Sequence, residues 1–413
     1  MIAGTSMSDK AMTRIGWIDE FKGFVLLLVC LYHIEQSFTN VNMGMLHLSA
    51  LRMSAFFFIS GFLFSTRRFP DFKSYFIHKT RVLLFPYIAL SLLFLALDPV
   101  LYHFEWFPRA PRMTVMTIRP EIATVWDYIY WNLAKIFVAG KSSIGSGPLW
   151  FVFTLYSVSL IFYGVQKIAK FLFKQREKEI PAQGREDTLK AKIAIAGAAI
   201  TSLIAGWLLY MNHIRLPLGI ERDLTVLFFF ANGWLCKGLI KNTPRDGIEP
   251  RHDIQSTALR RSSGTLLTAG FALISFILYA FIEVPDPNFS IMNNDLGKSP
   301  WIFVASSFFG IAGLVATFML ADKLPNIAPV RIVKGILRNI SRNALVILAV
   351  HWWILLVLRI IFKKEMDRPG IAYLSALIVT AGVIAAIPIF RCKLYKLLGK
   401  EKVSVRESLR IRD

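Results

Sequence analysis

The sequence predicts an all-α fold, in which about ten transmembrane helices form a polytopic membrane bundle. Hydrophobic residues make up 55% of the 413 positions and charged residues only 18%, whereas soluble domains carry roughly 25% charge. The mean hydropathy is +0.51. Apolar runs of about 18 to 22 residues recur along the chain, and each is long enough to cross a hydrocarbon core of roughly 30 Å. Most of the protein is therefore expected to lie in the membrane.

The apolar runs define the expected helices in chain order. They cover residues 21–38, 46–65, 82–103, 148–166, 193–211, 224–240, 264–283, 300–320, 344–362 and 371–390. We expect these helices to form one transmembrane domain over residues 21–390. A segment of residues 1–20 precedes this domain, and a basic tail of residues 391–413 follows it.

The distribution of basic residues predicts the orientation of the bundle. An even number of helices places both termini on one side of the membrane. The segments on that side, 1–20, 66–81, 167–192, 237–262, 321–343 and 391–413, hold 34 Lys and Arg residues, against 11 in the five opposite loops. Because basic loops remain in the cytoplasm, both termini are predicted to be cytoplasmic.

The net charge and the cysteines exclude several other interpretations. The charge of +21 does not indicate nucleic-acid binding, because the basic residues lie in short loops between apolar runs. The three cysteines, Cys30, Cys236 and Cys392, show neither metal-ligand nor redox spacing. The first apolar run continues past Cys30 and carries His33 and Glu35 in place of a small-residue cleavage site, so we expect it to remain as an anchor.

Two connecting segments have helical character of their own. In the segment 104–147, apolar residues between 126 and 137 recur at helical spacing beside Asn132 and Lys135, which predicts an amphipathic helix in the outer interface. Residues 167–192 are expected to extend the fourth helix and then form a solvated linker. No convincing internal repeat is present, which argues against a transporter built from inverted halves.

The first apolar run contains the strongest candidates for chemistry. Ionisable groups inside a membrane cost at least about 2.5 to 3.5 kcal/mol each on insertion scales, so they mark function or buried pairing. The run IDEFKGFVLLLVCLYHIEQSF carries Asp19, Lys22, His33 and Glu35. Lys22 and His33 are eleven residues apart, roughly 16 Å along a helix and on nearly one face. His33 then lies in the outer half of the membrane, where an imidazole suits proton transfer. Alternatively, His33 is a packing residue and Lys22 snorkels at the boundary.

A basic segment precedes the third expected helix. It reads RRFPDFKSYFIHKTRVLLFPYI and places Lys79 and Arg81 at the entry of that helix. Cationic groups at this depth can bind the phosphates of an anionic donor such as a coenzyme A thioester. They can equally serve only to orient the chain. The residues alone leave both roles open.

Four more side chains are candidates for the wall of a polar cavity. SGPLWFVFTLYSV places Trp150 at the outer start of the fourth helix, as a cavity residue or an aromatic-belt anchor. ISRNALVILAVHWWIL places His351 near mid-membrane, and a second buried imidazole favours a cavity shared with the first helix. Backbone carbonyls could instead satisfy either ring. Arg52 and Arg359 lie near the outer ends of the second and ninth helices. They either bind an anionic acceptor or snorkel, with the charged group extended to the membrane surface.

At these residues the chain resembles acyltransferase family three, bacterial integral membrane O-acyltransferases that include sugar O-acetylases. The family pattern matches IDEFKGFVLLLVCLYH, in which Asp19 precedes Lys22 and Gly23, ten residues follow Lys22, and His33 closes the motif. Further landmarks follow in order, and they are FFFISGFLF, HKTRVLLFPY, GPLWFVFTL and SRNALVILAVH. Many members have arginine at the positions of Lys22 and Lys79, so here the charge is retained without bidentate phosphate geometry.

The resemblance implies transfer of an acyl group, most often acetyl, from a cytoplasmic acyl-CoA co-substrate to a hydroxyl of a saccharide or lipid-linked glycan. In this hypothesis Lys79 and Arg81 hold the donor phosphates, Lys22 guides the pantetheine arm, and His33 deprotonates the acceptor. Asp19 belongs to the same catalytic motif. The acceptor is expected to contact Trp150, His351, Glu35 and Arg52. Direct transfer and an acyl-His33 intermediate both remain open.

The resemblance also implies a multi-pass protein of the bacterial inner membrane, with membrane lipids as neighbours. We expect no tightly bound cofactor and no metal site, because His33 and His351 lack the close ligand partners that zinc requires. The oligomeric state is open. Two alternatives stand beside the enzyme. One is a proton-coupled transporter using His33, Glu35 and His351, and the other is a non-catalytic component of polysaccharide export.

Overall fold

The chain folds into an all-helical bundle, as predicted. The structure is a computed structural model that describes residues 16–38, 41–66, 69, 71–103, 122, 124–141, 143, 145–174, 183–241, 254–283, 289–297, 299–325 and 327–400. In this part of the chain, the only strand-like pairing is an isolated bridge between Ser290 and Asp295. The predicted terminal segments 1–20 and 391–413 lie mostly outside the described residues, as do most of the loop residues 104–123 and the linker residues 175–182.

A helix forms over each of the ten predicted spans. These helices are α1 (Gly16–Glu35), α2 (Ser49–Leu63), α4 (Phe85–His103), α6 (Trp150–Lys174), α7 (Gln183–Met211), α8 (Ile220–Lys241), α9 (Ile254–Glu283), α10 (Pro300–Asp322), α12 (Ala344–Ile361) and α13 (Pro369–Cys392). Among the described residues, eight helical segments are long and apolar enough to cross a membrane. Those eight do not include α1 and α8, which both carry ionisable residues in their first turns.

The third predicted helix begins earlier than expected. A short helix, α3 (Phe72–Lys79), continues through a π-helical segment (Thr80–Leu84) into α4. Lys79 and Arg81 therefore lie inside a continuous helix and not in a loop before it. The π-helical segment has a local cause: Pro86 lacks an N–H group and its ring crowds the carbonyl one turn earlier, so the ladder shifts by one residue and Phe85 bonds Thr80.

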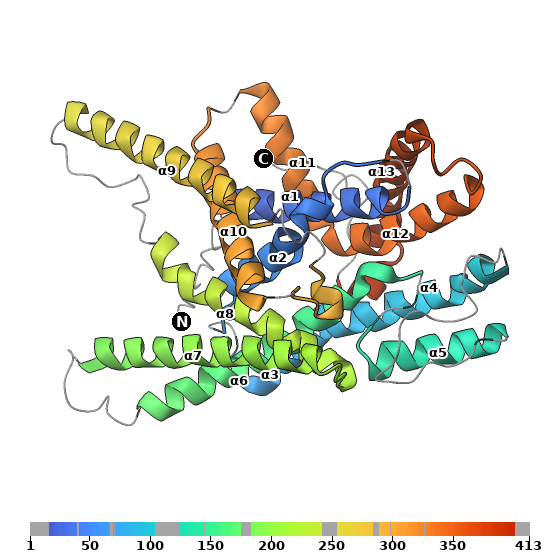
Figure 1. Ribbon diagram of the computed structural model, residues 1–413, viewed down its shortest axis with the longest axis horizontal. Helices are drawn as coiled ribbons and strands as arrows, with labels where there is room; N and C mark the ends of the chain where they lie inside the picture. The colour runs from blue at the N-terminus through green and yellow to red at the C-terminus, as the bar shows by residue number, and fades with distance from the viewer. Residues whose placement is uncertain are drawn as a thin grey trace, which may run out of the picture.

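The helix α5 (Val125–Val138) forms in the segment where an amphipathic helix was predicted. Figure 1 shows it running alongside α4. Its polar side is buried, with Asn132 1% and Lys135 6% exposed, whereas Trp126 and Tyr130 are 63% and 66% exposed. This corrects the expected arrangement of an interfacial helix, whose polar side faces water. The reason is that this side of α5 packs into the bundle, where Tyr128 donates to the buried Asp98 of α4 and Asn132 and Lys135 bond within α5.

The helix α11 (Ala328–Arg342) was not predicted, because its basic residues made residues 321–343 resemble a loop. It packs against the first half of α1. The contact is close at Gly23, where a Cβ atom would collide with the carbonyl group of Leu337. A larger residue than glycine at this crossing would therefore separate the two helices.

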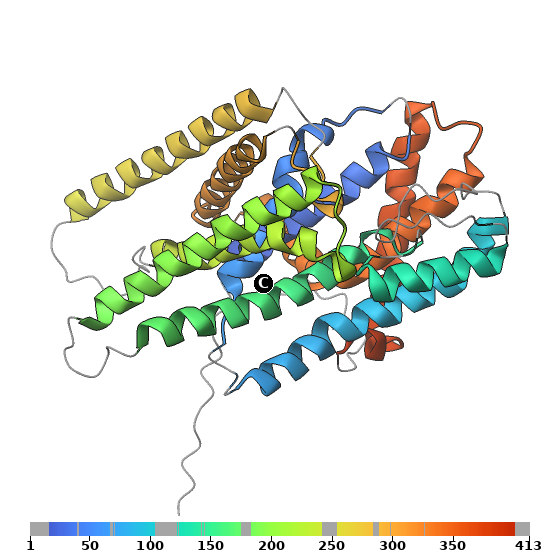
Figure 2. The same cartoon turned by 60° about the horizontal axis from the view of Figure 1, so that its bottom comes forward.

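The centre of the bundle is held by closely packed helices and aromatic side chains. Helices α2 and α8 approach through Gly61 and Gly233, because a Cβ at either position would collide with a carbonyl of the other helix. Helix α9 lies at the edge of the bundle beside α10, and α13 lies beside α12 at another edge (Figures 1 and 2). The end of α1 and the starts of α2 and α6 come together inside this frame, where they form the walls of a cavity.

Candidate functional site

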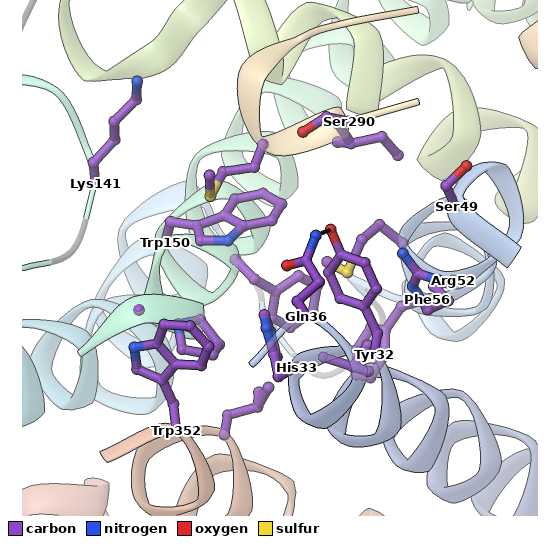
Figure 3. A pocket seen from close by; sticks show the side chains of 18 of the residues that line it. Tyr32, His33, Gln36, Ser49, Arg52, Phe56, Lys141, Trp150, Ser290 and Trp352 are labelled. Carbon is purple, nitrogen blue, oxygen red and sulfur yellow. Dashed lines mark hydrogen bonds between the residues drawn. The ribbon is translucent and has the colours of Figure 1, made fainter. Parts of the chain in front are cut away.

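The cavity has a volume of about 340 Å³, which lies at the lower end of the usual range for small-molecule sites. Its walls come from α1, α2, α5, α6 and α12, together with the segments 141–148 and 289–292 (Figure 3). The lining is mainly apolar and aromatic, with a few polar groups between. The polar and charged side chains among the described lining residues are Tyr32, His33, Gln36, Ser49, Arg52, Lys135, Lys141, Ser143 and Ser290.

Helix α1 presents His33 to this cavity. Leu26, Val29, His33 and Gln36 line it, at intervals of three and four residues that place them on one helix face. The His33 ring centroid lies 4.7 Å from the Trp352 ring and 5.5 Å from the His351 ring. In the described part of the chain, the buried Nδ1 atom of His33 has no hydrogen-bond partner. The ring of His33 thus borders the cavity and keeps a nitrogen that no described group occupies, which leaves it able to accept or donate a proton.

The second imidazole, His351, lies behind the cavity wall and is 1% exposed. Its Nδ1 atom is 2.6 Å from the carbonyl oxygen of Ile347, one turn earlier in α12. Because a carbonyl only accepts, Nδ1 carries the hydrogen, and Nε2 of the neutral ring is left as the acceptor. Among the described residues Nε2 has no partner. The predicted proximity of the two histidines is therefore present, although only His33 lines the cavity.

Arg52 and Tyr32 form one charged wall of the cavity. The Arg52 guanidinium carbon lies 3.8 Å from the centre of the Tyr32 ring, a cation–π contact, and the guanidinium also donates to the carbonyl of Met45. The Tyr32 hydroxyl is hydrogen-bonded to Gln36, as the dashed line in Figure 3 shows. These contacts hold the positive charge of Arg52 at the predicted place beside the cavity.

Trp150 forms another wall. It begins α6 directly after the short 3₁₀ turn Gly147–Leu149, and it is 7% exposed. One neighbour is the buried Arg222, whose guanidinium carbon lies 5.3 Å from the centre of the indole. Position 147 has no room for a side chain, because a Cβ atom there would collide with the indole of Trp352. Trp150 is thus a cavity residue, one of the two roles that the sequence allowed.

Glu35, predicted to contact the acceptor, does not line the cavity. It is 6% exposed, and its Oε2 atom accepts hydrogen bonds from the backbone N–H groups of Met43 and Met45 at 2.7 and 3.0 Å. The carboxylate therefore fixes the chain between α1 and α2. Since Met45 also accepts from Arg52, this link positions the arginine indirectly.

The remaining predicted site residues lie away from the cavity lining. Asp19 accepts a hydrogen bond of 3.4 Å from Ser341 of α11. Lys22 lies eleven residues before His33 on α1, roughly 16 Å along the axis. The Lys79 ammonium is 5.5 Å from the Tyr75 ring centre, and Arg81 is exposed. Four of the predicted site residues therefore lie outside the lining of the His33 cavity: Asp19 and Lys22 of α1, and Lys79 and Arg81 of the α3 to α4 helix.

Sequence reasoning missed a buried carboxyl group that supports the cavity. Asp98 of α4 is fully buried and accepts a 2.8 Å hydrogen bond from Tyr128 of α5. A Cβ atom at Gly145 would collide with this carboxyl group, so the backbone at Gly145 packs directly on it. The signal in the sequence was an aspartate near the end of an otherwise apolar run.

A second missed group lies at the start of α8. Arg222 and Asp223 are each 1% exposed, with Nε and Oδ1 3.8 Å apart. Arg222 also donates to the carbonyl of Gly140 at 3.3 Å, and Asp223 accepts from Ser157. The cluster of ionisable residues in IERDL, directly before an apolar run, was the available signal.

The fold and the cavity define the class of protein: it is a multi-pass helical membrane protein with an internal cavity that is lined by an imidazole. The chain belongs to acyltransferase family 3, because the model of that family's acyltransferase domain matches residues 15–390, nearly the whole chain. This confirms the resemblance drawn from the motifs. No curated protein and no solved structure matches the chain. The protein is therefore a membrane acyltransferase.

Proposed function

We propose that this acyltransferase transfers an acyl group, in the simplest case acetyl, from cytoplasmic acyl-CoA to a hydroxyl of a saccharide or lipid-linked glycan. The observation that carries the proposal is His33, an imidazole that lines a cavity of about 340 Å³ and has no described partner at Nδ1. An acyltransferase needs a base for the acceptor hydroxyl, and His33 is the imidazole that meets this need at the cavity.

The proposed reaction proceeds through a tetrahedral intermediate. His33 takes the proton of the acceptor hydroxyl while the oxygen attacks the thioester carbonyl. The intermediate then collapses, the carbon–sulfur bond breaks, and the imidazolium returns the proton to the leaving thiolate. The products are the O-acyl ester and free CoA, and His33 is regenerated. A positioned histidine base accelerates such steps by about 10² to 10⁴-fold.

The donor is proposed to enter from the end of the bundle opposite to His33. Lys79 and Arg81 lie there on the α3 to α4 helix, and Asp98, near the cavity, is 19 residues beyond Lys79, or roughly 28 Å along the helix axis. The charge distribution of the loops supports a cytoplasmic location for the Lys79 end. Phosphates bound there leave the extended pantetheine arm to pass Lys22 and present the thioester to His33.

The acceptor is proposed to occupy the cavity from the outer side. Trp150 and Trp352 offer flat aromatic faces to the apolar face of a sugar ring, and Arg52 offers a hydrogen-bond donor. His351 borders His33 without lining the cavity, so its role is to orient that ring. The inner membrane of a bacterium is the location that fits a cytoplasmic donor and an envelope glycan.

The test is label transfer from radiolabelled acetyl-CoA to membrane glycans, in membranes containing wild-type protein, His33→Ala or His47→Ala at matched expression. His47 is an exposed histidine outside the cavity and serves as the control. We expect wild type and His47→Ala to transfer label and His33→Ala to lose at least about 100-fold in rate. Equal transfer by His33→Ala would reject His33 as the base. No transfer from acetyl-CoA or longer acyl-CoA donors would reject the proposed reaction.

A further inference from the structure

Two lysines line the cavity on its α5 side, and among the described residues neither forms an ion pair with a carboxylate. Lys135 is 6% exposed, and the hydrogen bond of its ammonium is with Asn132 Oδ1 at 3.2 Å. Lys141 is half-buried. In the described part of the chain, no carboxylate oxygen lies within ion-pair distance of either ammonium, and no Asp or Glu lines the cavity.

The backbone at the end of α5 fixes the two lysines beside each other. The N–H of Lys141 donates to the carbonyl of Lys135 at 3.0 Å, and Gly140 between them has φ +57°, a conformation that favours glycine. The Tyr87 hydroxyl lies 2.9 and 2.8 Å from the carbonyls of Ile136 and Lys141. The backbone of both lysines is therefore held in place before any ligand arrives.

The nearby carboxylates are already bound to other groups. Asp98 accepts from Tyr128, and Asp223 accepts from Ser157 and lies beside Arg222. Glu221 accepts from the backbone N–H of Leu216 and lies 3.8 Å from Arg215. In the described chain, Asp98 and Glu221 therefore act on the two ammonium groups only from beyond ion-pair distance. Burying a charge in this way is costly unless an opposite charge is supplied.

We propose that Lys135 and Lys141 bind an anionic group of the acceptor, a carboxylate or a phosphate, so that the enzyme acylates an acidic or phosphate-bearing glycan. This inference rests on the proposed function, which identifies the cavity as the acceptor site. Lysines are compact point charges and accept either anion, whereas a planar carboxylate alone would favour the arginine fork. Figure 3 shows Lys141 and Arg52 at opposite ends of the labelled residues, so an anion at Lys141 lies far from Arg52.

The burial of the two lysines supports an anion site. It lowers the pKa of Lys135 and of Lys141 to about 8 each, which means that their charged forms are disfavoured without a counter-ion. Lys141 lowers the pKa of Lys135 further, and Arg222 and Arg215 lower that of Lys141, while Asp98 opposes the effect at Lys135 and Glu221 opposes it at Lys141. A bound anion would compensate both charges. The anionic donor is not the ligand here, because the residues proposed for it, Lys79 and Arg81, do not line this cavity.

The experiment measures binding and transfer separately with the full-length protein in detergent. Three probes that differ in charge are titrated without acyl-CoA: methyl β-glucoside, methyl β-glucuronide and methyl β-glucoside 6-phosphate. The same probes are then offered with radiolabelled acetyl-CoA. The proteins are wild type, Lys135→Gln, Lys141→Gln and the control Lys363→Gln, an exposed lysine outside the cavity. Thermal unfolding verifies that each variant is folded.

We expect wild type and Lys363→Gln to bind at least one charged probe about 10-fold or more tightly than the glucoside, as charge-assisted hydrogen bonds allow. Either lysine variant should lose most of that preference and raise KM for the acceptor, not for acetyl-CoA. Because Lys141 is less buried than Lys135, its variant keeps the test valid if Lys135→Gln unfolds. The preferred probe, uronate or phosphate, identifies the source of the anion.

Equal binding of all three probes by wild type, or no binding of either charged probe, would overturn the anion site. Transfer to neutral sugars with unchanged lysine variants would overturn it as well, and would leave the proposed function intact. Selective anion binding with no acetyl transfer would support the anion site and reject the proposed reaction.

Discussion

The two ends of α1 use the same kinds of residues for different purposes. At the N-terminal end, Glu20 is 1% exposed and paired with Arg338 of α11, with Nη2 and Oε1 2.7 Å apart. Asp19 accepts from Ser341, and Gly23 packs on the α11 backbone. At the C-terminal end, His33 faces a cavity with Nδ1 unpaired in the described chain. Paired polar groups hold the helix in place, whereas the unpaired one is available for chemistry.

This comparison divides the family motif into two functions. In the first half, Asp19, Glu20 and Gly23 contact α11, whereas Lys22 is the residue proposed to guide the donor. The second half ends at a ring that contacts another imidazole and an indole at 5.5 and 4.7 Å. Substitutions at Asp19, Glu20 or Gly23 should therefore change stability, and the substitution at His33 should change rate. The predictions below test this division.

The largest effect on stability is expected at Gly23. Gly23→Ala places a Cβ against the carbonyl of Leu337, so α1 and α11 must separate. Because the obstacle is backbone, we expect a loss at or above the roughly 1 to 3 kcal/mol typical of overpacking. The measurement is thermal unfolding of detergent-purified protein. The control is Gly164→Ala in α6, where the structure has nothing within 4 Å of the added Cβ. Equal unfolding temperatures for the two variants would contradict the close packing.

A somewhat smaller loss is expected from breaking the pair of Glu20 and Arg338. Arg338→Gln leaves the Glu20 carboxylate buried without its counter-ion and should cost about 1 to 2 kcal/mol, less than in a fully buried pair because the Arg338 side chain is 24% exposed. The double variant Glu20→Gln with Arg338→Gln removes both charges and should recover most of that loss. Transfer rate per folded molecule should stay near the wild-type value. Additive effects of the two single substitutions would show that the pair does not couple.

The smallest effect is a pH dependence of acceptor binding, which follows from the anion proposal. Burial and the neighbouring cations Arg222 and Arg215 hold the pKa of Lys141 at about 8, with Glu221 acting in the opposite direction. Lys141 is therefore cationic at pH 7 and largely neutral at pH 9. KM for an anionic acceptor should rise by about 10-fold per lysine across that range.

Lys141→Arg provides the control for this titration, because arginine remains protonated throughout. Its KM for the anionic acceptor should rise about 10-fold less than that of wild type between pH 7 and pH 9, because only Lys135 still titrates, and KM of a neutral glycoside should be flat in both proteins. A wild-type KM for the anionic acceptor that is constant across this range would show that Lys141 does not bind the anion in its charged form.

The sequence predicted most helices because length and hydropathy are local properties. It missed α11, whose apolar residues Ile332, Val333 and Ile336 alternate with basic ones, so the segment resembled a charged loop. It also placed the start of the third helix at residue 82, because the polar residues of α3 concealed the helix that begins at Phe72.

The cavity was only partly predictable. His33 and Trp150 line it as expected, since a histidine inside an apolar run stands out in any sequence. Glu35 stood out equally, but its partners are backbone groups of residues 43 and 45, which no pattern reveals. Asp98 and Arg222 were missed because their hydrogen bonds are long-range, to Tyr128 and to Gly140. Pairing across the chain is a property of the packing and not of local composition.

The division of α1 is tested most directly by single-turnover acetyl transfer and thermal unfolding of two variants, His33→Ala and Asp19→Asn. The account predicts that His33→Ala unfolds like wild type but loses at least about 100-fold in rate. Asp19→Asn should unfold at a lower temperature and transfer within about 3-fold of wild type per folded molecule. Wild-type transfer by His33→Ala, or loss of transfer by a stable Asp19→Asn protein, would contradict the account.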